Sequence, residues 1–144
     1  MVKTIADVLR KKGNSVVSVS PDVEVFKALK LMASKDIGAV LVLEKGKVLG
    51  ILSERDYSRK IILEGRSSLD TPVQKIMETR VYSITPEMTV EEGLGLMTEN
   101  RTRHLPVIVD GQLNGLVSIG DLVYAIISKQ GFIIGQLENY ILND

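Results

Sequence analysis

Two serine–aspartate pairs are the residues of this chain best suited to bind a polar ligand. Ser53 precedes Asp56 by three residues, and Ser118 precedes Asp121 by the same spacing. An ionised carboxylate offers two acceptor oxygens, which suit the neighbouring hydroxyls of a ribose. Each serine lies where a strand is expected to turn into a helix, and a helix N-terminus offers free N–H groups and a positive dipole end to a phosphate. The same spacing is that of a helix-capping box, which is the simpler interpretation of either pair alone.

Basic side chains near these pairs could add phosphate contacts. Arg101, Arg103 and His104 form a cluster just before an expected strand, and arginine can hold a phosphate through two parallel hydrogen bonds. Arg55 and Arg59 are four residues apart, so they are expected to share a face of the helix that follows Ser53. The alternative is a solvated loop and an ordinary charged helix surface.

Composition excludes several kinds of protein. The chain has 144 residues, of which 44% are hydrophobic and 25% charged, as in a globular domain with a real core. Its formal net charge is zero, so it has no overall attraction to nucleic acid or acidic membranes. It has no cysteine and one histidine, which excludes disulfides, thiolate chemistry and a multi-histidine metal site within one chain. No signal peptide or membrane-spanning segment is expected, and the cytoplasm is the expected compartment.

The chain contains an internal repeat with an offset of 65 residues. Ser20-Pro21-Asp22 is echoed by Thr85-Pro86-Glu87, and both serine–aspartate pairs recur at the same offset. Because Ser20 and Thr85 each precede a proline, each is expected to be a helix N-cap, with the proline as the first helical residue.

Each copy is expected to fold in the order β-α-β-β-α, and the second copy runs from Val81 to Ile127. The elements of the first copy are a strand at 16–19, a helix from Pro21, strands at 39–43 and 48–52 around a turn at 44–47, and a helix from 53 to about 63. The expected division of the chain is an N-terminal helix (1–14), repeat 1 (15–65), a linker with a short helix (66–79), repeat 2 (80–128) and a helical tail (129–144).

This pattern resembles the cystathionine-β-synthase (CBS) domain family in its two-copy arrangement. The most specific element is Gly-x-x-Ser-x-x-Asp after a strand, which occurs at 50–56 and again at 115–121. One such motif is weak evidence, but two at equivalent places in aligned copies are strong evidence. Residues 103–107, Arg-His-Leu-Pro-Val, are similar to the family's strand-opening Leu-Pro-Val, from which the first copy departs at 37–40.

The resemblance implies an α/β (α+β) fold of two pseudo-symmetric repeats packed sheet to sheet, with two clefts. Such clefts often bind adenosyl compounds such as AMP, ADP, ATP, NAD or S-adenosylmethionine. Most CBS pairs regulate an enzyme or transporter, and this chain is similar to small bacterial stand-alone pairs. It is therefore expected to be a homodimeric regulatory module that binds an adenine nucleotide and signals to an unidentified partner protein.

The resemblance also implies the ligand-binding residues. The Asp of one copy is expected to face the strand-opening loop of the other. One cleft would contain Ser53, Arg55, Asp56, Arg59, Thr85, Arg103 and His104, and the other Ser20, Ile37, Gly38, Ser118 and Asp121. Leu105, Pro106 and Ala39 complete the expected set. For Ser20 and Thr85 the resemblance implies a contact to the sugar or phosphate of the ligand, and the alternative is a capping role alone. The first-copy loop has no cation, and the uncharged Gly120 and Tyr124 match Arg55 and Arg59, so the two clefts should differ.

Three other functions are alternatives to this interpretation. An enzyme is disfavoured, because no nucleophile–base pair and no phosphate-binding loop is visible. A nucleic-acid-binding protein is disfavoured by zero net charge and few aromatic residues. A ligand-independent interaction or dimerisation module remains the main alternative, with Met32, Met88, Met97 and the apolar residues of the tail at the interface or in the core.

Overall fold

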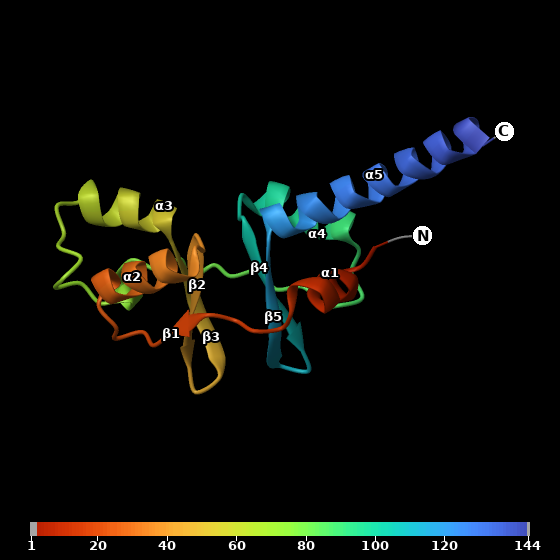
Figure 1. Ribbon diagram of the computed structural model, residues 1–144. Helices are drawn as coiled ribbons and strands as arrows, with labels where there is room; N and C mark the ends of the chain where they lie inside the picture. Colours follow the sequence, from red (N-terminus) through yellow and green to blue (C-terminus); the bar gives the residue numbers. More distant parts are fainter. Residues whose placement is uncertain (1–2, 144) are drawn as a thin grey trace. The chain divides into compact units, whose positions relative to one another are not determined.

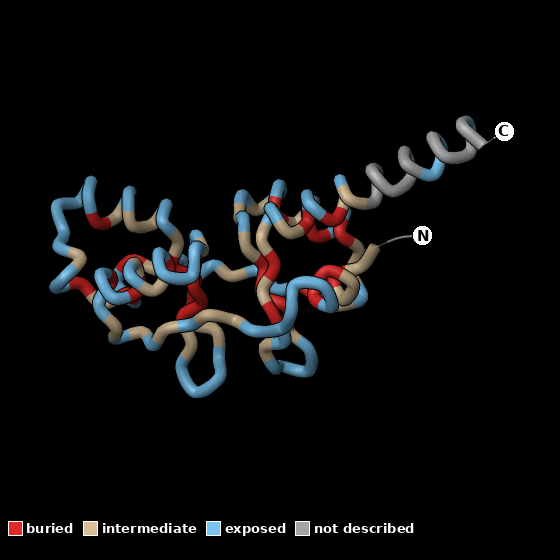
Figure 2. Tube along the Cα trace, viewed as in Figure 1, coloured by how far each residue is buried: buried red, intermediate tan, exposed pale blue. Residues whose placement is uncertain are grey.

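The computed structural model describes residues 3–143 and divides into two compact units (Figure 1). Unit 1 comprises residues 3–14, 83–108 and 115–143, and unit 2 comprises residues 15–82 and 109–114. In each unit the buried residues gather where helices meet strands (Figure 2). The mixed α/β class expected from the sequence is confirmed.

Unit 2 is built on the first copy. Strand β1 pairs in parallel with β2, and β2 pairs antiparallel with β3, as expected for β-α-β-β order. The turn between β2 and β3 is tight, because Lys45 and Gly46 both adopt positive φ, at 52° and 79°. The elements are β1 (Ser18–Val19), α2 (Val25–Lys35), β2 (Ala39–Glu44), β3 (Lys47–Ser53), α3 (Glu54–Asp56), the π-helix η1 (Tyr57–Ile62) and the short 3₁₀ helix η2 (Val73–Lys75).

Unit 1 is built on the second copy. Its first strand is reduced to one parallel bridge between Ile84 and Val107, and the antiparallel pair β4–β5 follows. Helix α1 is capped by Thr4, whose side chain accepts from the Asp7 N–H, and it ends at Gly13 as expected. The elements are α1 (Ile5–Lys12), α4 (Val90–Asn100), β4 (His104–Val109), β5 (Gln112–Ser118) and α5 (Ile119–Asn143), and only residues 109–114 of the β4–β5 hairpin are assigned to unit 2.

The short helix that precedes each copy packs in the unit of the other copy. In unit 1, the Ile5 N–H of α1 donates to the Met88 carbonyl at 2.8 Å. In unit 2, the Val73 N–H of η2 donates to the Val23 carbonyl, also at 2.8 Å. These bonds are equivalent, since Val23 and Met88 are 65 residues apart in the repeat. The two opening helices are therefore exchanged between the copies.

The predicted N-caps at Ser20 and Thr85 are wrong. Helix α2 begins at Val25, four residues after Pro21, and α4 begins after Thr89, whose side chain accepts from the Glu92 N–H. Ser20 and Pro21 instead open a β-turn, closed by the Val23 N–H on the Ser20 carbonyl at 3.3 Å. Proline is favoured both at the second position of such a turn and at the first position of a helix. A proline in the sequence therefore does not distinguish a β-turn from a helix start.

The C-terminal segment continues the last helix of the second copy. Helix α5 runs without a break from Ile119 to Asn143, through residue 129, where a separate tail was expected to begin. Among the described residues, no helix is both long and apolar enough to cross a membrane.

Candidate functional site

Both serine–aspartate pairs form the capping box that was the structural alternative to a ligand site. The Ser53 Oγ accepts from the Asp56 N–H at 3.2 Å, and the Ser53 N–H donates to Asp56 Oδ2 at 3.1 Å. The pair at Ser118 and Asp121 repeats these bonds at 3.1 and 2.8 Å. The N–H of each serine uses only one carboxylate oxygen, so the cap leaves the second oxygen of each aspartate for another partner.

Each unit brings its strand-opening loop beside its own motif. In unit 2 the Glu54 N–H donates to the Gly38 carbonyl at 3.1 Å, and Ala39 pairs with Ser53 across β2 and β3. In unit 1 the Ile119 N–H donates to the Arg103 carbonyl at 2.8 Å. Within each unit, therefore, the strand-opening loop and the serine–aspartate motif lie side by side. The expected pairing of each motif with the loop of the other copy stays a prediction.

Each motif aspartate also has a lysine counter-ion, and the two lysines come from different elements. Asp56 lies 3.6 Å from Lys60 of its own helical segment. Asp121 receives the Lys12 ammonium of α1 at 2.6 Å, and Lys12 also donates to the Leu116 carbonyl at 2.6 Å. Lys12 was not expected at this site, because no local spacing in the sequence connects residues 109 positions apart. The basic end of α1, at residues 10–12, was the only signal in the sequence.

The electrostatic environment of the unit 1 motif keeps Asp121 ionised and His104 neutral. Burial alone would raise the pKa of the Asp121 carboxyl, but hydrogen bonds from Lys12 and Ser118 hold it below its ordinary value. Burial lowers the pKa of His104, and the nearby Lys12 charge lowers it further against the opposing effect of Asp121. A neutral imidazole offers one donor and one acceptor, which suits an uncharged ring edge or a hydroxyl.

Comparison with known proteins identifies the family. The CBS domain family model matches residues 5–63 and 73–128. The chain belongs to the CBS domain family. The two matched ranges begin at the opening helices, so α1 and the η2 segment are parts of the repeats themselves.

Relatives of this CBS pair match it over most of its length. It is 42% identical to the mitochondrial CBS domain-containing protein CBSX3 of Arabidopsis thaliana, over 96% of this chain and 71% of that protein. A CBS-domain protein of Burkholderia ambifaria, assigned provisionally to signal transduction, is 44% identical, with a TM-score of 0.86 over 89% of this chain and 96% of the other. A hexameric CBS-CP12 protein from bloom-forming cyanobacteria is 28% identical, with a TM-score of 0.75 over 86% and 72%. The chain is a tandem CBS module of the kind found in regulatory and signal-transduction proteins.

The remaining residues of the expected ligand set differ in accessibility. Leu105, Pro106 and Ala39 are buried, so their side chains belong to the cores of their units and only their main chains could face a ligand. Ile37 is half-buried beside the core of unit 2. Exposed side chains remain available for contact: Ser20, Arg55, Arg59, Thr85 and Arg103. Arg59 lies in the π-helix, where the turn is wider than in an α-helix, so the shared face expected for Arg55 and Arg59 does not follow from their spacing.

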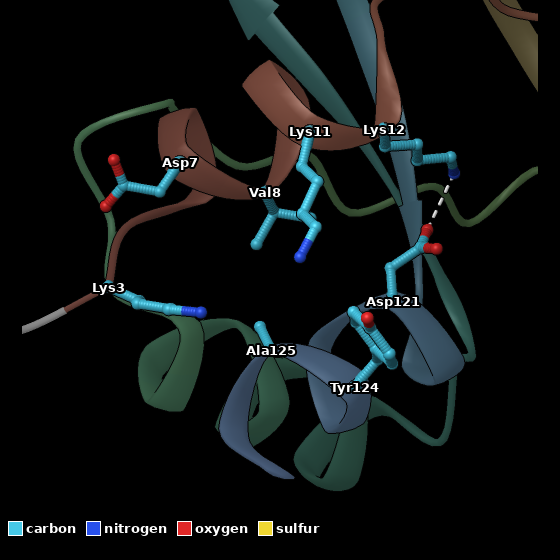
Figure 3. Close-up of a pocket in the computed structure, with 8 residues that line it drawn as sticks. All are labelled: Lys3, Asp7, Val8, Lys11, Lys12, Asp121, Tyr124 and Ala125. Carbon is cyan, nitrogen blue, oxygen red and sulfur yellow. Dashed lines mark hydrogen bonds and ion pairs between the residues drawn. The ribbon is translucent and has the colours of Figure 1, made fainter. Parts of the chain in front are cut away.

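A pocket of about 320 Å³ lies in unit 1 between α1 and the start of α5 (Figure 3). Asp121 and Lys12 form one end of it, and the ring of Tyr124 stands beside them. Val8 and Ala125 supply apolar lining, and the remaining lining residues are Lys3, Asp7 and Lys11. No residue of this pocket other than Asp121 was expected from the sequence to bind a ligand. Among the described residues, no cluster of acidic and histidine side chains could hold a metal ion.

His104 should titrate with a pKa below 6.5, so the folded protein should be less stable when its imidazole is protonated than when it is neutral. On acidification below pH 6.5 the unfolded chain binds a proton that the folded chain resists, so the free energy of unfolding should fall until the folded-state pKa is reached. Because His104 is the only histidine, its ring resonances report this pKa directly by NMR.

Two variants separate the causes of the His104 shift. Lys12→Gln should raise the pKa of His104, because a repelling charge is lost, while Asp121→Asn should lower it further. His104→Gln should remove the loss of stability between pH 7.5 and 5.5. A pKa of His104 at or above 6.5 would contradict the burial of its ring.

Proposed function

We propose that this CBS pair binds an adenine nucleotide of the AMP, ATP or NAD type and acts as a ligand sensor in the cytoplasm, not as a catalyst. The observation that carries the proposal is the spare carboxylate oxygen of Asp121. Its Oδ2 accepts from Ser118 and Lys12, whereas no hydrogen bond to Oδ1 occurs among the described residues. The side chain is 26% exposed and ionised, so Oδ1 can accept from a ribose hydroxyl while the cap stays formed.

The neighbours of Asp121 suit the other parts of a nucleotide. His104 opens β4 next to Arg103, whose carbonyl already binds the first N–H of α5. A neutral His104 can exchange hydrogen bonds with the edge of an adenine, and the exposed Arg103 guanidinium can bind phosphate. Ligand binding acts as a signal only if the two conformational states of the protein differ in affinity.

Thermal unfolding with AMP, ADP, ATP, NAD, NADH, S-adenosylmethionine and GTP tests the proposal. A ligand at about 100 times its Kd should add about 2.7 kcal/mol and raise the Tm by several degrees. Asp121→Asn should lose this increment, because an amide NH₂ replaces one acceptor oxygen. Asp110→Asn is the matched control, since it removes the same charge at an exposed turn residue.

Ser118→Ala separates capping from ligand binding. Without ligand it should lower stability by about 0.5–2 kcal/mol, because the Asp121 N–H loses its partner. With ligand, the increment in Tm should persist in Ser118→Ala and vanish in Asp121→Asn. If none of the seven compounds raises the Tm, the sensor hypothesis is wrong and both motifs are helix caps only.

A second candidate, a ligand-independent homodimerisation module, rests on the exposed apolar face of α5. Ile119, Val123 and Ile127 follow one another at four-residue spacing and are 41%, 40% and 60% exposed. Leu137 and Ile141 continue the exposed apolar residues of this helix, at 57% and 72%. The hexameric CBS-CP12 relative supports assembly as a property of such modules. A molar mass that stays at one chain, independent of concentration, in light scattering would remove this candidate.

A further inference from the structure

The repeat symmetry reveals a difference between the two units beside their motif aspartates. In unit 2, the Lys60 side chain spans from Asp56 to the Ile76 carbonyl, with its ammonium 3.6 Å from the carboxylate and 3.0 Å from the carbonyl oxygen. The residue 65 positions after Lys60 is Ala125. The opening-helix residue equivalent to Ile76 is Val8, by the register that pairs Val73 with Ile5.

The pocket of unit 1 occupies the place of that lysine. Val8 and Ala125 both line it, and alanine has no side chain to cross from α5 to α1. Asp121 obtains its counter-ion from Lys12 at the side of this space instead (Figure 3). The short side chain of Ala125 thus leaves open in unit 1 a volume that a lysine crosses in unit 2.

The pocket carries uncompensated positive charge. Lys3 and Lys11 point into the space between the two helices (Figure 3), and neither has a carboxylate oxygen within 4.0 Å among the described residues. Asp7 points away and is already engaged with Thr4 and Arg10. A hydrogen bond with Ser128 lowers the pKa of Tyr124 most, and the positive charges of Lys11 and Lys3 lower it further. The two lysines therefore make the electrostatic potential at the Tyr124 hydroxyl more positive.

The pocket also has an aromatic wall. The Lys11 ammonium lies 5.3 Å from the centroid of the Tyr124 ring, and Val8 and Ala125 complete an apolar surface. A flat ring can stack against tyrosine while an anionic group attached to it reaches the lysines. A volume of about 320 Å³ suits a ligand of that size.

We infer that the α1–α5 pocket binds a small aromatic anion, with its phosphate or carboxylate held by Lys3 and Lys11 and its ring against Tyr124. The pocket shares Asp121 with the proposed nucleotide site as part of its end wall, but none of the strand-opening residues lines it. It exists in unit 1 because position 125 is alanine.

The test is an NMR titration of the full chain with phenyl phosphate, benzoate and inorganic phosphate. Phenyl phosphate should shift the backbone amides of α1 and of the first turns of α5, benzoate should shift them less, and inorganic phosphate least. Higher salt should weaken the response, because the contacts are charged and partly exposed. Equal responses to phenyl phosphate and inorganic phosphate would overturn the aromatic part of the inference, and no response to any probe would overturn all of it.

Two variants test the site itself. Ala125→Lys should place a lysine across the pocket, as Lys60 does in unit 2, and weaken phenyl phosphate binding at least about tenfold. Lys3→Gln with Lys11→Gln, which leaves the core untouched, should weaken it by a similar factor. Lys45→Gln with Lys47→Gln removes the same charge from two exposed residues, in the β2–β3 turn and at the start of β3, and should leave binding unchanged. Undiminished binding in the Lys3 and Lys11 variant would overturn the site, whether or not Ala125→Lys folds.

The nucleotide experiment keeps the two sites distinguishable. Asp121→Asn should abolish a nucleotide-induced rise in Tm, whereas Lys3→Gln with Lys11→Gln should preserve it. Displacement of phenyl phosphate by a saturating adenine nucleotide would overturn the separateness of the pocket.

Discussion

Replacing Ile5 by alanine is expected to destabilise unit 1 by about 2–5 kcal/mol. Ile5 is fully buried, and its core cluster includes Val90, Leu105 and Leu122 of the second copy. The substitution removes three carbon atoms from a packed site and leaves a cavity that the surrounding helices and strands can fill only in part. The effect should be measured by urea unfolding.

The unit that loses hydrogen-exchange protection shows whether α1 packs in the core of the second copy or in that of the first. Hydrogen exchange should speed up in α4, β4 and α5, which share a core with Ile5, and not in β2 and β3. Val73→Ala should produce the converse pattern, because Val73 belongs to the core of unit 2. Ile62→Ala is the control, since Ile62 is 60% exposed and its loss should change stability by no more than about 0.5 kcal/mol. Loss of protection in β2 and β3 of Ile5→Ala would contradict the exchange of opening helices.

The elements of each copy were predictable because their signals are local. Apolar runs and the Lys45-Gly46 turn define β2 and β3 within a few residues of one another, and the structure confirms both strands within one residue of the expected ends. The capping boxes at Ser53 and Ser118 were also predictable, since their geometry requires only an acidic residue three positions after the serine. A match repeated at the offset of 65 residues made each signal stronger.

The features that the sequence did not predict depend on contacts between distant segments. Nothing in the spacing of residues 5–12 indicates that α1 completes the core of the second copy, so it was expected only as a flanking helix. The counter-ion role of Lys12 follows from that packing and was hidden with it. The prolines at 21 and 86 illustrate a different limit, because a β-turn and a helix start accept the same residue at the same point.

The glycine of the first motif should be less replaceable than its equivalent in the second. A Cβ at Gly50 would lie 2.8 Å from the Glu78 carbonyl oxygen, and that oxygen is fixed by the Ile51 N–H at 3.0 Å. A Cβ at Gly115 would meet only the Leu9 side chain, also at 2.8 Å, and a leucine can rotate away. Gly50→Ala should therefore destabilise the protein by about 1–3 kcal/mol, and Gly115→Ala by less.

Urea unfolding of Gly50→Ala, Gly115→Ala and the double variant checks this order. Unit 2 should lose hydrogen-exchange protection in Gly50→Ala, because separating β3 from Glu78 breaks the bonds that join Ile51 to that residue in both directions. Gly115→Ala combined with Leu9→Ala should be less destabilised than the sum of the two single variants, since the shorter side chain makes room for the new methyl group. Equal destabilisation by the two alanines would show that the Glu78 carbonyl yields as easily as a side chain. The predicted order instead assigns the motif glycine a packing role, separate from any ligand contact of the serine and aspartate that follow it.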